Sequence, residues 1–259
     1  MVKQCCKLAI DLYPEFQIKY VRIMKIKDAI PPLHQEGYIF VICGIAVAFL
    51  AGAAFPTLGW ICVLITIFMA CFFRDPHRVS PEGDNVIVSP ADGTIDKIEE
   101  ATAPAELGDS KTTYKRVSIF LSVFNVHVNR VPASGTITDL HYRKGSFVSA
   151  SLDKASSENE RQVCAVKMKS GQTIVFVQIA GLIARRIVCY LNEKQEVKAG
   201  ESFGIIRFGS RADVYLPKDA ELNVIEGQTM VGGETVIARL NNKVVGKAIP
   251  KISSKTKKS

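Results

Sequence analysis

The chain has 259 residues, of which 47% are apolar and 22% charged, and its formal net charge is +8. This composition excludes a chain that is disordered throughout. The 18 glycines and 11 prolines without a period exclude a collagen-like repeat. The length fits one domain or a small pair of domains.

Residues 1–36 form a leader rich in lysine and arginine. Met24 is an alternative start, with which residues 1–23 would lie outside the native chain.

The next segment, residues 37–73, contains no Asp, Glu, Lys or Arg. Pro56 and Gly59 divide it into pieces at about 38–55 and 57–73. Each piece is close to the roughly 17–20 residues that cross the hydrocarbon of a bilayer, and each is apolar on every helical face. The segment therefore predicts a membrane-embedded helical hairpin, which either spans the bilayer or dips into it.

Basic residues flank the hairpin on both sides, in the leader and at Arg74 and Arg78. This pattern favours a cell-membrane protein with both hairpin ends, and hence its main domain, on the cytoplasmic side. The seven cysteines form no CxxC pair and are typical of free thiols in a reducing compartment. The positive charge suits an anionic membrane surface, and no nucleic-acid-binding motif accompanies it.

Residues 74–250 are rich in short apolar or alternating runs separated by turn residues, which predicts a mainly β domain, a compact sandwich or barrel. A short helical insertion fits residues 149–160, and the basic tail at 251–259 is expected to be disordered. The clearest predicted strands are Asn85–Val88, Arg116–Val123, Thr173–Gln178, Gly204–Phe208, Asp213–Leu216, Leu222–Ile225 and Thr235–Leu240.

Among the four histidines, His127 is the candidate for function, since it is placed at the end of an apolar strand and before a proline-containing turn. Asp92, in the sequence SPADG, is either a functional carboxylate or the Asp of an Asp-Gly turn. No set of Cys and His has the spacing of a zinc site, so no metal is expected. No phosphate-binding or dinucleotide-binding glycine motif occurs either.

Gly209 and Ser210 interrupt a region of strong strand character. A Gly-Ser pair contributes little to packing at such a place, so it indicates close backbone approach or reactivity.

Seven segments form a recognisable pattern: FFRDPHR (72–78), SPADG (89–93), FLSVFNVHVNRVPASG (120–135), YRKGSFVSA (142–150), NER (159–161), QIAGLIARRI (178–187) and GIIRFGSRADVYLP (204–217). With these segments the chain resembles the phosphatidylserine decarboxylase proenzymes of the short bacterial type. The resemblance runs in collinear order from about Glu36 to Leu240. It implies a mainly β fold with lipoyl-like elements next to a membrane-embedded helical segment.

The resemblance also implies a covalent pyruvoyl cofactor. Decarboxylation of an amino acid needs an electron sink that ordinary side chains lack. In this family the hydroxyl of Ser210 would attack the carbonyl of Gly209, and elimination and hydrolysis would leave a pyruvoyl group on a small chain of residues 210–259, paired with a large chain of residues 1–209. The pyruvoyl carbonyl would form an imine with the serine amine of the phospholipid substrate, which would lose CO2.

By the same resemblance, His127 is the base for self-cleavage and Asp92 is the carboxylate that orients it. Relatives in another branch have a second histidine three residues further on, where this sequence has Arg130. We therefore expect His127 to serve both in cleavage and in decarboxylation, and Arg130 to contact the phosphate or carboxylate of the substrate.

Two alternatives remain at this point. The enzyme could act on another serine-headed lipid, such as an archaetidylserine-like ether lipid. The chain could instead be a non-enzymatic, membrane-anchored adaptor with a lipoyl-like domain.

Overall fold

The computed structural model describes residues 31–108, 112–145, 159–181, 186–207 and 210–240. The leader up to residue 30, the tail, residues 149–158 of the proposed helical insertion and Gly209 lie outside the described residues, and Asn159 and Glu160 are not helical. The elements are η1 Gln35–Gly37, α3 Tyr38–Ala54, α4 Pro56–Phe72, β1 Val86–Val88, β2 Gly93–Thr102, η2 Ala105–Leu107, β3 Thr113–Leu121, β4 Val128–Arg130, β5 Gly135–Arg143, β6 Arg161–Lys167, β7 Thr173–Ala180, β8 Ile187–Cys189, β9 Glu196–Val197, β10 Ser202–Ile206, β11 Ser210–Pro217, β12 Glu221–Leu222, β13 Thr229–Met230 and β14 Val236–Arg239.

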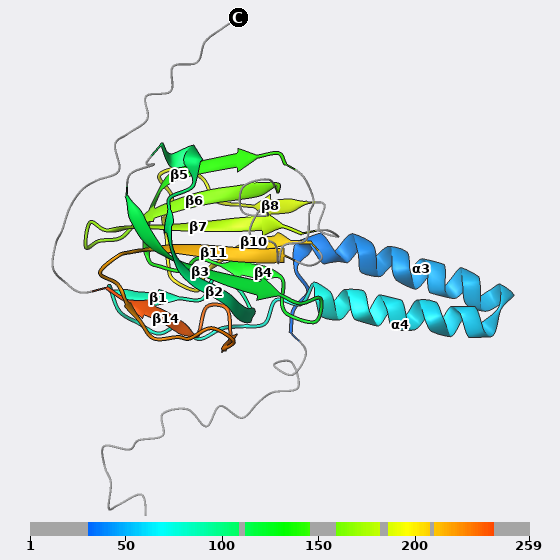
Figure 1. Cartoon of the computed structure of the whole chain (residues 1–259). Coiled ribbons are helices and arrows are strands. Elements are labelled where there is room, and N and C mark those ends of the chain that lie inside the picture. Colours follow the sequence, from blue (N-terminus) through cyan, green and yellow to red (C-terminus); the bar gives the residue numbers. More distant parts are fainter. Residues whose placement is uncertain (1–30, 109–111, 146–158, 182–185, 208–209, 241–259) are drawn as a thin grey trace, which may run out of the picture. The chain divides into compact units, whose positions relative to one another are not determined.

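The apolar segment folds as two helices that run side by side (Figure 1). Pro56 occupies the first turn of α4, where its missing N–H costs no hydrogen bond. Small residues let the helices approach closely, since a Cβ on Gly59 would lie 2.5 Å from the Cα of Gly52. The expected division at Pro56 is confirmed. The segment Gln35–Ala54 is long and apolar enough to cross a membrane, while α4 is a shorter apolar helix.

A short antiparallel contact closes the base of this hairpin. The N–H of His34 donates to the carbonyl of Phe73 at 2.8 Å, and the N–H of Asp75 donates to the carbonyl of Pro32 at 2.8 Å. The ring of Phe40 stacks on the ring of Phe73. The two ends of the apolar segment are thus held together where they meet the β strands.

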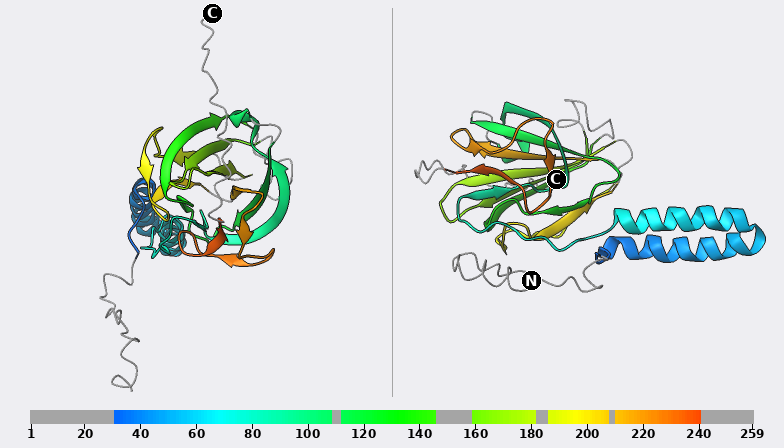
Figure 2. Two further views of the ribbon diagram at one scale, coloured as in Figure 1. Left: turned by 90° about the vertical axis from the view of Figure 1, so that its left-hand side faces the viewer. Right: turned by 90° about the horizontal axis from the view of Figure 1, so that it is seen from below.

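The rest of the described chain is built from three sheets. The largest has eight strands in the order β13-β2-β3-β11-β7-β6-β5-β9, and the others have the orders β4-β10-β8 and β1-β14-β12. Figure 2 shows that the large sheet is strongly curled. The expected mainly β fold with an N-terminal helical hairpin is confirmed.

Strand β11 lies in the middle of the large sheet, between β3 and β7. Side chains alternate between the two faces of a strand. Val214 and Leu216 belong to the main hydrophobic core, whereas Tyr215 belongs to a second cluster on the other face. Ser210 therefore projects to the same face as the main core.

Most of the predicted strands are present, including those that became β1, β3, β7, β10, β11 and β14. The prediction missed β2, β5 and β6, which are among the longest strands of the large sheet. It also extended the strand after Leu222 too far, because Asn223–Glu226 is a loop in the structure.

Candidate active site

His127 lies in the connection between β3 and β4 and directly precedes β4, rather than at the end of the preceding strand as predicted. A tight turn shapes this connection. The hydroxyl and the backbone N–H of Ser122 both donate to Oδ1 of Asn125, at 2.7 and 2.8 Å. The turn fixes the backbone carbonyl of Asn125, two residues before the imidazole.

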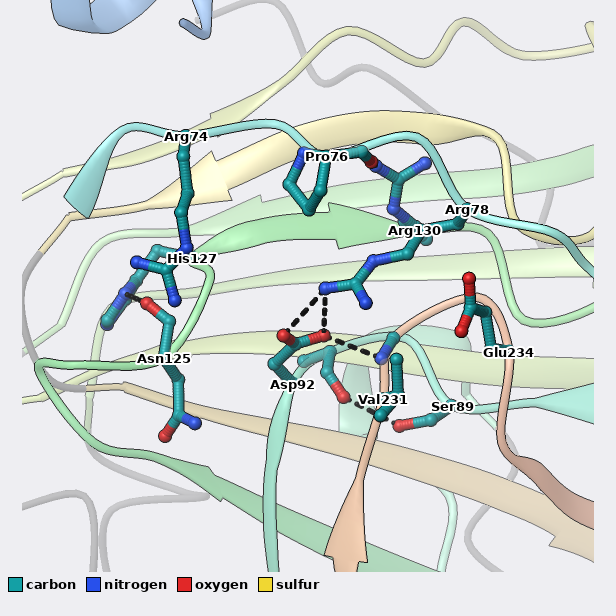
Figure 3. Close-up of polar contacts among 12 residues, drawn as sticks. Arg74, Pro76, Arg78, Ser89, Asp92, Asn125, His127, Arg130, Val231 and Glu234 are labelled. Atoms are coloured by element: carbon teal, nitrogen blue, oxygen red, sulfur yellow. Dashed lines mark hydrogen bonds and ion pairs between the residues drawn. The ribbon is translucent and has the colours of Figure 1, made fainter. Parts of the chain in front are cut away.

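The hydrogen bonding of the imidazole determines its tautomer. Nδ1 of His127 lies 3.0 Å from the backbone carbonyl oxygen of Asn125 (Figure 3). Because a carbonyl only accepts, Nδ1 carries the proton and Nε2 holds a free lone pair. Nε2 is buried and has no hydrogen-bond partner among the residues that the structure describes. The residue is therefore arranged as a base.

The surroundings keep His127 neutral. Its side chain is fully buried, and its ring stacks on the ring of Phe72 with 4.1 Å between centroids. The pKa of His127 is lowered from 6.5 to about 4, mainly because of burial, with a smaller contribution from the charge of Arg74 and against the opposing effect of the Asn125 hydrogen bond. At pH 7 the lone pair on Nε2 is available.

Ser210 is the first residue of β11 and is paired with Leu121 on one side and Ala180 on the other. Its side chain is completely buried, and within the described part of the chain its Oγ has no hydrogen-bond partner. The N–H of Ile206, four residues earlier, donates to the carbonyl of His127 at 3.4 Å. The β4–β10 pairing thus brings the backbone of His127 beside the chain that leads directly into Ser210.

Asp92 does not contact His127. Its carboxylate accepts two hydrogen bonds from Nη2 of Arg78, at 2.7 and 3.0 Å, and one from the N–H of Gly232 at 2.7 Å (Figure 3). The expected turn between two strands is present, because Asp92 lies between β1 and β2. In this arrangement the carboxylate holds the turn to the segment after α4, and the Asn125 carbonyl orients the imidazole instead.

Arg130 is also engaged by the protein. Its guanidinium donates to the carbonyl of Gly200 at 3.0 Å, to the carbonyl of Pro76 at 2.7 Å and to the carboxylate of Asp75. Burial lowers its pKa, which the neighbouring Asp75 opposes. These contacts tie β4 to the segment after α4, and a substrate anion would have to compete with them.

Sequence reasoning missed two buried amides in this region. Asn129 is in β4, and Gln178 is a polar residue within the otherwise apolar segment Thr173–Ala180. Nε2 of Gln178 donates to Oδ1 of Asn129 at 2.7 Å. The feature of the sequence that could have revealed them is a single glutamine within a predicted apolar strand.

Comparison with known proteins identifies the family. The family model for phosphatidylserine decarboxylase matches residues 65–238. The chain belongs to the phosphatidylserine decarboxylase family. It is 54% identical over 216 residues to the phosphatidylserine decarboxylase proenzyme of Rickettsia bellii (strain OSU 85-389), covering 83% of this chain and 94% of the relative.

Two further relatives have the same name. The protein of Rickettsia rickettsii (strain Sheila Smith) is 55% identical over 216 residues, covering 83% of this chain and 94% of the relative. That of Wolbachia sp. subsp. Brugia malayi (strain TRS) is 50% identical over 214 residues, covering 82% and 93%. Phosphatidylserine decarboxylases are carboxy-lyases, so the chain is an enzyme and the adaptor alternative is wrong.

Proposed function

We propose that this enzyme decarboxylates phosphatidylserine to phosphatidylethanolamine and CO2, with a pyruvoyl group that it makes from its own Ser210. The observation that carries the proposal is a neutral histidine with a buried base nitrogen, and a buried serine hydroxyl, neither of which has a hydrogen-bond partner among the described residues. The hydrogen bond from Ile206 to the carbonyl of His127 brings the two segments together. Unpaired polar atoms are costly in a protein interior, and catalytic sites are where they are retained.

The residues fit the formation of such a group. Nε2 of His127 takes the proton of the Ser210 hydroxyl, whose oxygen attacks the carbonyl of Gly209. The acyl group moves from nitrogen to oxygen, and β-elimination of the resulting ester releases residues 1–209 with a carboxylate on Gly209 and leaves dehydroalanine at position 210. Water then hydrolyses the imine form of this residue, which releases ammonia and leaves the pyruvoyl group on residues 210–259. The pairing of β11 with β3 and β7 would keep the two chains together.

The pyruvoyl carbonyl would supply the electron sink for the carbanion that the loss of CO2 leaves behind. The chain's own part in that reaction is proton transfer and exclusion of water. His127, which takes a proton during cleavage, is positioned to return one to the substrate carbon. The aromatic ring of Phe72 shields it from solvent.

We assign the orienting role to the backbone carbonyl of Asn125, because that atom accepts the Nδ1 hydrogen bond. Asp92 would then act on the site indirectly, by holding the β1–β2 turn through Arg78. The orienting contact that the family resemblance implies between Asp92 and His127 would require the carboxylate to leave Arg78.

The apolar hairpin suits a lipid substrate, whose acyl chains remain in the bilayer. Phe72, the last residue of α4, reaches the imidazole directly, so the catalytic region adjoins the base of the apolar segment. We propose membrane attachment through this hairpin with the β domain on the cytoplasmic side. Another serine-headed lipid would present the same headgroup and remains the second candidate substrate.

The test is intact mass spectrometry of the purified protein, together with CO2 release from phosphatidylserine vesicles. Wild type should give two chains of residues 1–209 and 210–259, and the smaller should lack an N-terminal amine. Ser210→Ala should give one inactive chain, and Ser146→Ala, at the other Gly-Ser pair, should be cleaved normally. Two chains in Ser210→Ala would refute the assignment.

A further inference from the structure

The buried amide pair of Asn129 and Gln178 has hydrogen-bonding capacity left over. The side chains are 0% and 1% exposed, and they use one hydrogen bond to bind each other. In the described ranges of the chain, Nδ2 of Asn129 and Oε1 of Gln178 have no hydrogen-bond partner. Each unpaired buried polar group destabilises the fold by about 1–3 kcal/mol. The amide pair is therefore destabilising unless a ligand binds to its unused atoms.

The sheet register places this pair beside the catalytic residues. Gln178 is directly opposite Ala212, and Ser210 is directly opposite Ala180. Gln178 and Ser210 are therefore diagonal neighbours on one face of the sheet, about 7–8 Å apart. Asn129 follows His127 by two residues along the extended segment that forms β4. The amide pair thus links β4, which directly follows His127, to β7, which is paired with the strand that begins at Ser210.

The unused atoms define the chemistry of a ligand. Nδ2 of Asn129 is a donor and Oε1 of Gln178 is an acceptor, and both are uncharged. An α-amino acid head carries a carboxylate, which accepts, and an amine, which donates, on the same carbon. The nearby guanidinium of Arg130 is already bound to Asp75, Pro76 and Gly200.

We propose that Asn129 and Gln178 are the specificity-determining residues for the serine headgroup. Nδ2 of Asn129 donates to the substrate carboxylate, and Oε1 of Gln178 accepts from the substrate amine. This inference rests on the proposed function, in which the amine reacts at the position of Ser210.

The same contacts discriminate between substrate and product. The ethanolamine headgroup has no carboxylate, so its binding leaves Nδ2 of Asn129 unpaired again. A site built to bind a polar group rejects an analogue that lacks the group. A hydrogen bond to a charged group corresponds to roughly tenfold or more in affinity, so the serine head should bind at least about tenfold more tightly than the ethanolamine head.

The experiment measures binding without turnover. The mature enzyme is treated with borohydride to reduce its pyruvoyl carbonyl, and calorimetry then gives the affinities of dihexanoylphosphatidylserine and dihexanoylphosphatidylethanolamine. The key variant is Asn129→Asp, which still accepts the hydrogen bond from Gln178 but replaces the free donor with a carboxylate oxygen. It should lose the serine preference, because the introduced charge repels the substrate carboxylate.

A second variant avoids any effect of added charge. Asn129→Leu combined with Gln178→Met removes both polar groups and keeps their approximate volumes, which should leave the melting temperature unchanged or raised. It too should lose the serine preference. The matched control is Ser118→Ala, which removes another buried, unpartnered polar atom. Ser118 is paired with Asp213, on the opposite face from Ser210, so the control should keep the preference.

Different results refute the proposed function and the role of the amide pair. A wild-type protein that stays in one chain by mass spectrometry would refute the proposed function. A cleaved, active enzyme in which Asn129→Asp and the double variant keep the wild-type serine preference would refute only the role of the amide pair. Loss of the preference in Ser118→Ala to the same extent would also refute it.

Discussion

Phe72 controls the protonation of His127 through direct contact, and Phe72→Ala tests this. The Phe72 ring covers one face of the imidazole at 4.1 Å and an interplanar angle of 28°. Its removal lets water reach that face. Since burial is the main cause of the lowered pKa, the pKa of His127 should rise in the variant.

The expected change in the pKa of His127 follows from how far this pKa is lowered in wild type. The pKa of His127 lies about 2.5 units below its ordinary value of 6.5, on the order of 3 kcal/mol at 1.36 kcal/mol per unit. Phe72 covers one of the two ring faces, so we expect its loss to restore roughly half of the shift, moving the pKa up by about one unit.

The measurement is a pH titration of carbon-13-labelled histidines by NMR, in a Ser210→Ala background that keeps the chain uncut. His127→Gln identifies the His127 signal among the four histidines. Phe73→Ala is the matched control, because Phe73 is a neighbouring buried aromatic that stacks on Phe40 instead. Its effect on the His127 titration should be small.

Two results would contradict the reasoning. A wild-type midpoint near 6.5 would show that burial does not hold the imidazole neutral. An unchanged midpoint in Phe72→Ala, or an equal shift in Phe73→Ala, would show that the stacked ring is not the cause.

Three further predictions concern stability and maturation. Between pH 6.5 and about 4 the unfolded chain binds a proton at His127 that the folded chain does not. In the uncut Ser210→Ala background, the unfolding free energy in urea should therefore fall on the order of 3 kcal/mol more with His127 present than with His127→Gln as the pH is lowered through this window. Gly204→Ala would place a Cβ 2.1 Å from the carbonyl oxygen of Val188, so the β8–β10 pairing should be disrupted and the melting temperature should fall well below that of wild type. Glu36→Ala removes the carboxylate paired with Arg207, two residues before Gly209, and should slow the appearance of the two chains on a gel several-fold; an unchanged rate would exclude a role for the ion pair in positioning the cleavage site.

The sequence predicted those parts of the fold that depend on local pattern. The uncharged segment and Pro56 were enough for two helices, and the apolar segment Thr173–Ala180 was enough for a strand. Strand β2 was missed because its residues Asp96–Glu100 are mostly charged, and their packing depends on partners such as Arg116 across the sheet. No local pattern contains that information.

For the candidate site, the sequence alone identified individual residues but not their partners. His127 and Ser210 stand out within their own segments, so sequence alone could select them. The partner of Asp92 could not be predicted, because the segment after α4 brings Arg78 to it in three dimensions. The hydrogen bond between Asn129 and Gln178 joins residues 49 positions apart. It forms only because the fold brings strands of two different sheets together.

The stack of Phe72 on His127 has a practical consequence for anyone who wants a soluble form of this enzyme. A chain shortened to begin at Arg74 would lack the apolar helices. It would also lack the Phe72 ring that covers one face of the imidazole and the backbone hydrogen bond between His34 and Phe73. Such a truncated protein would present the imidazole to water and titrate differently from the whole enzyme. Detergent or lipid nanodiscs around the intact hairpin are therefore the suitable setting for kinetic work.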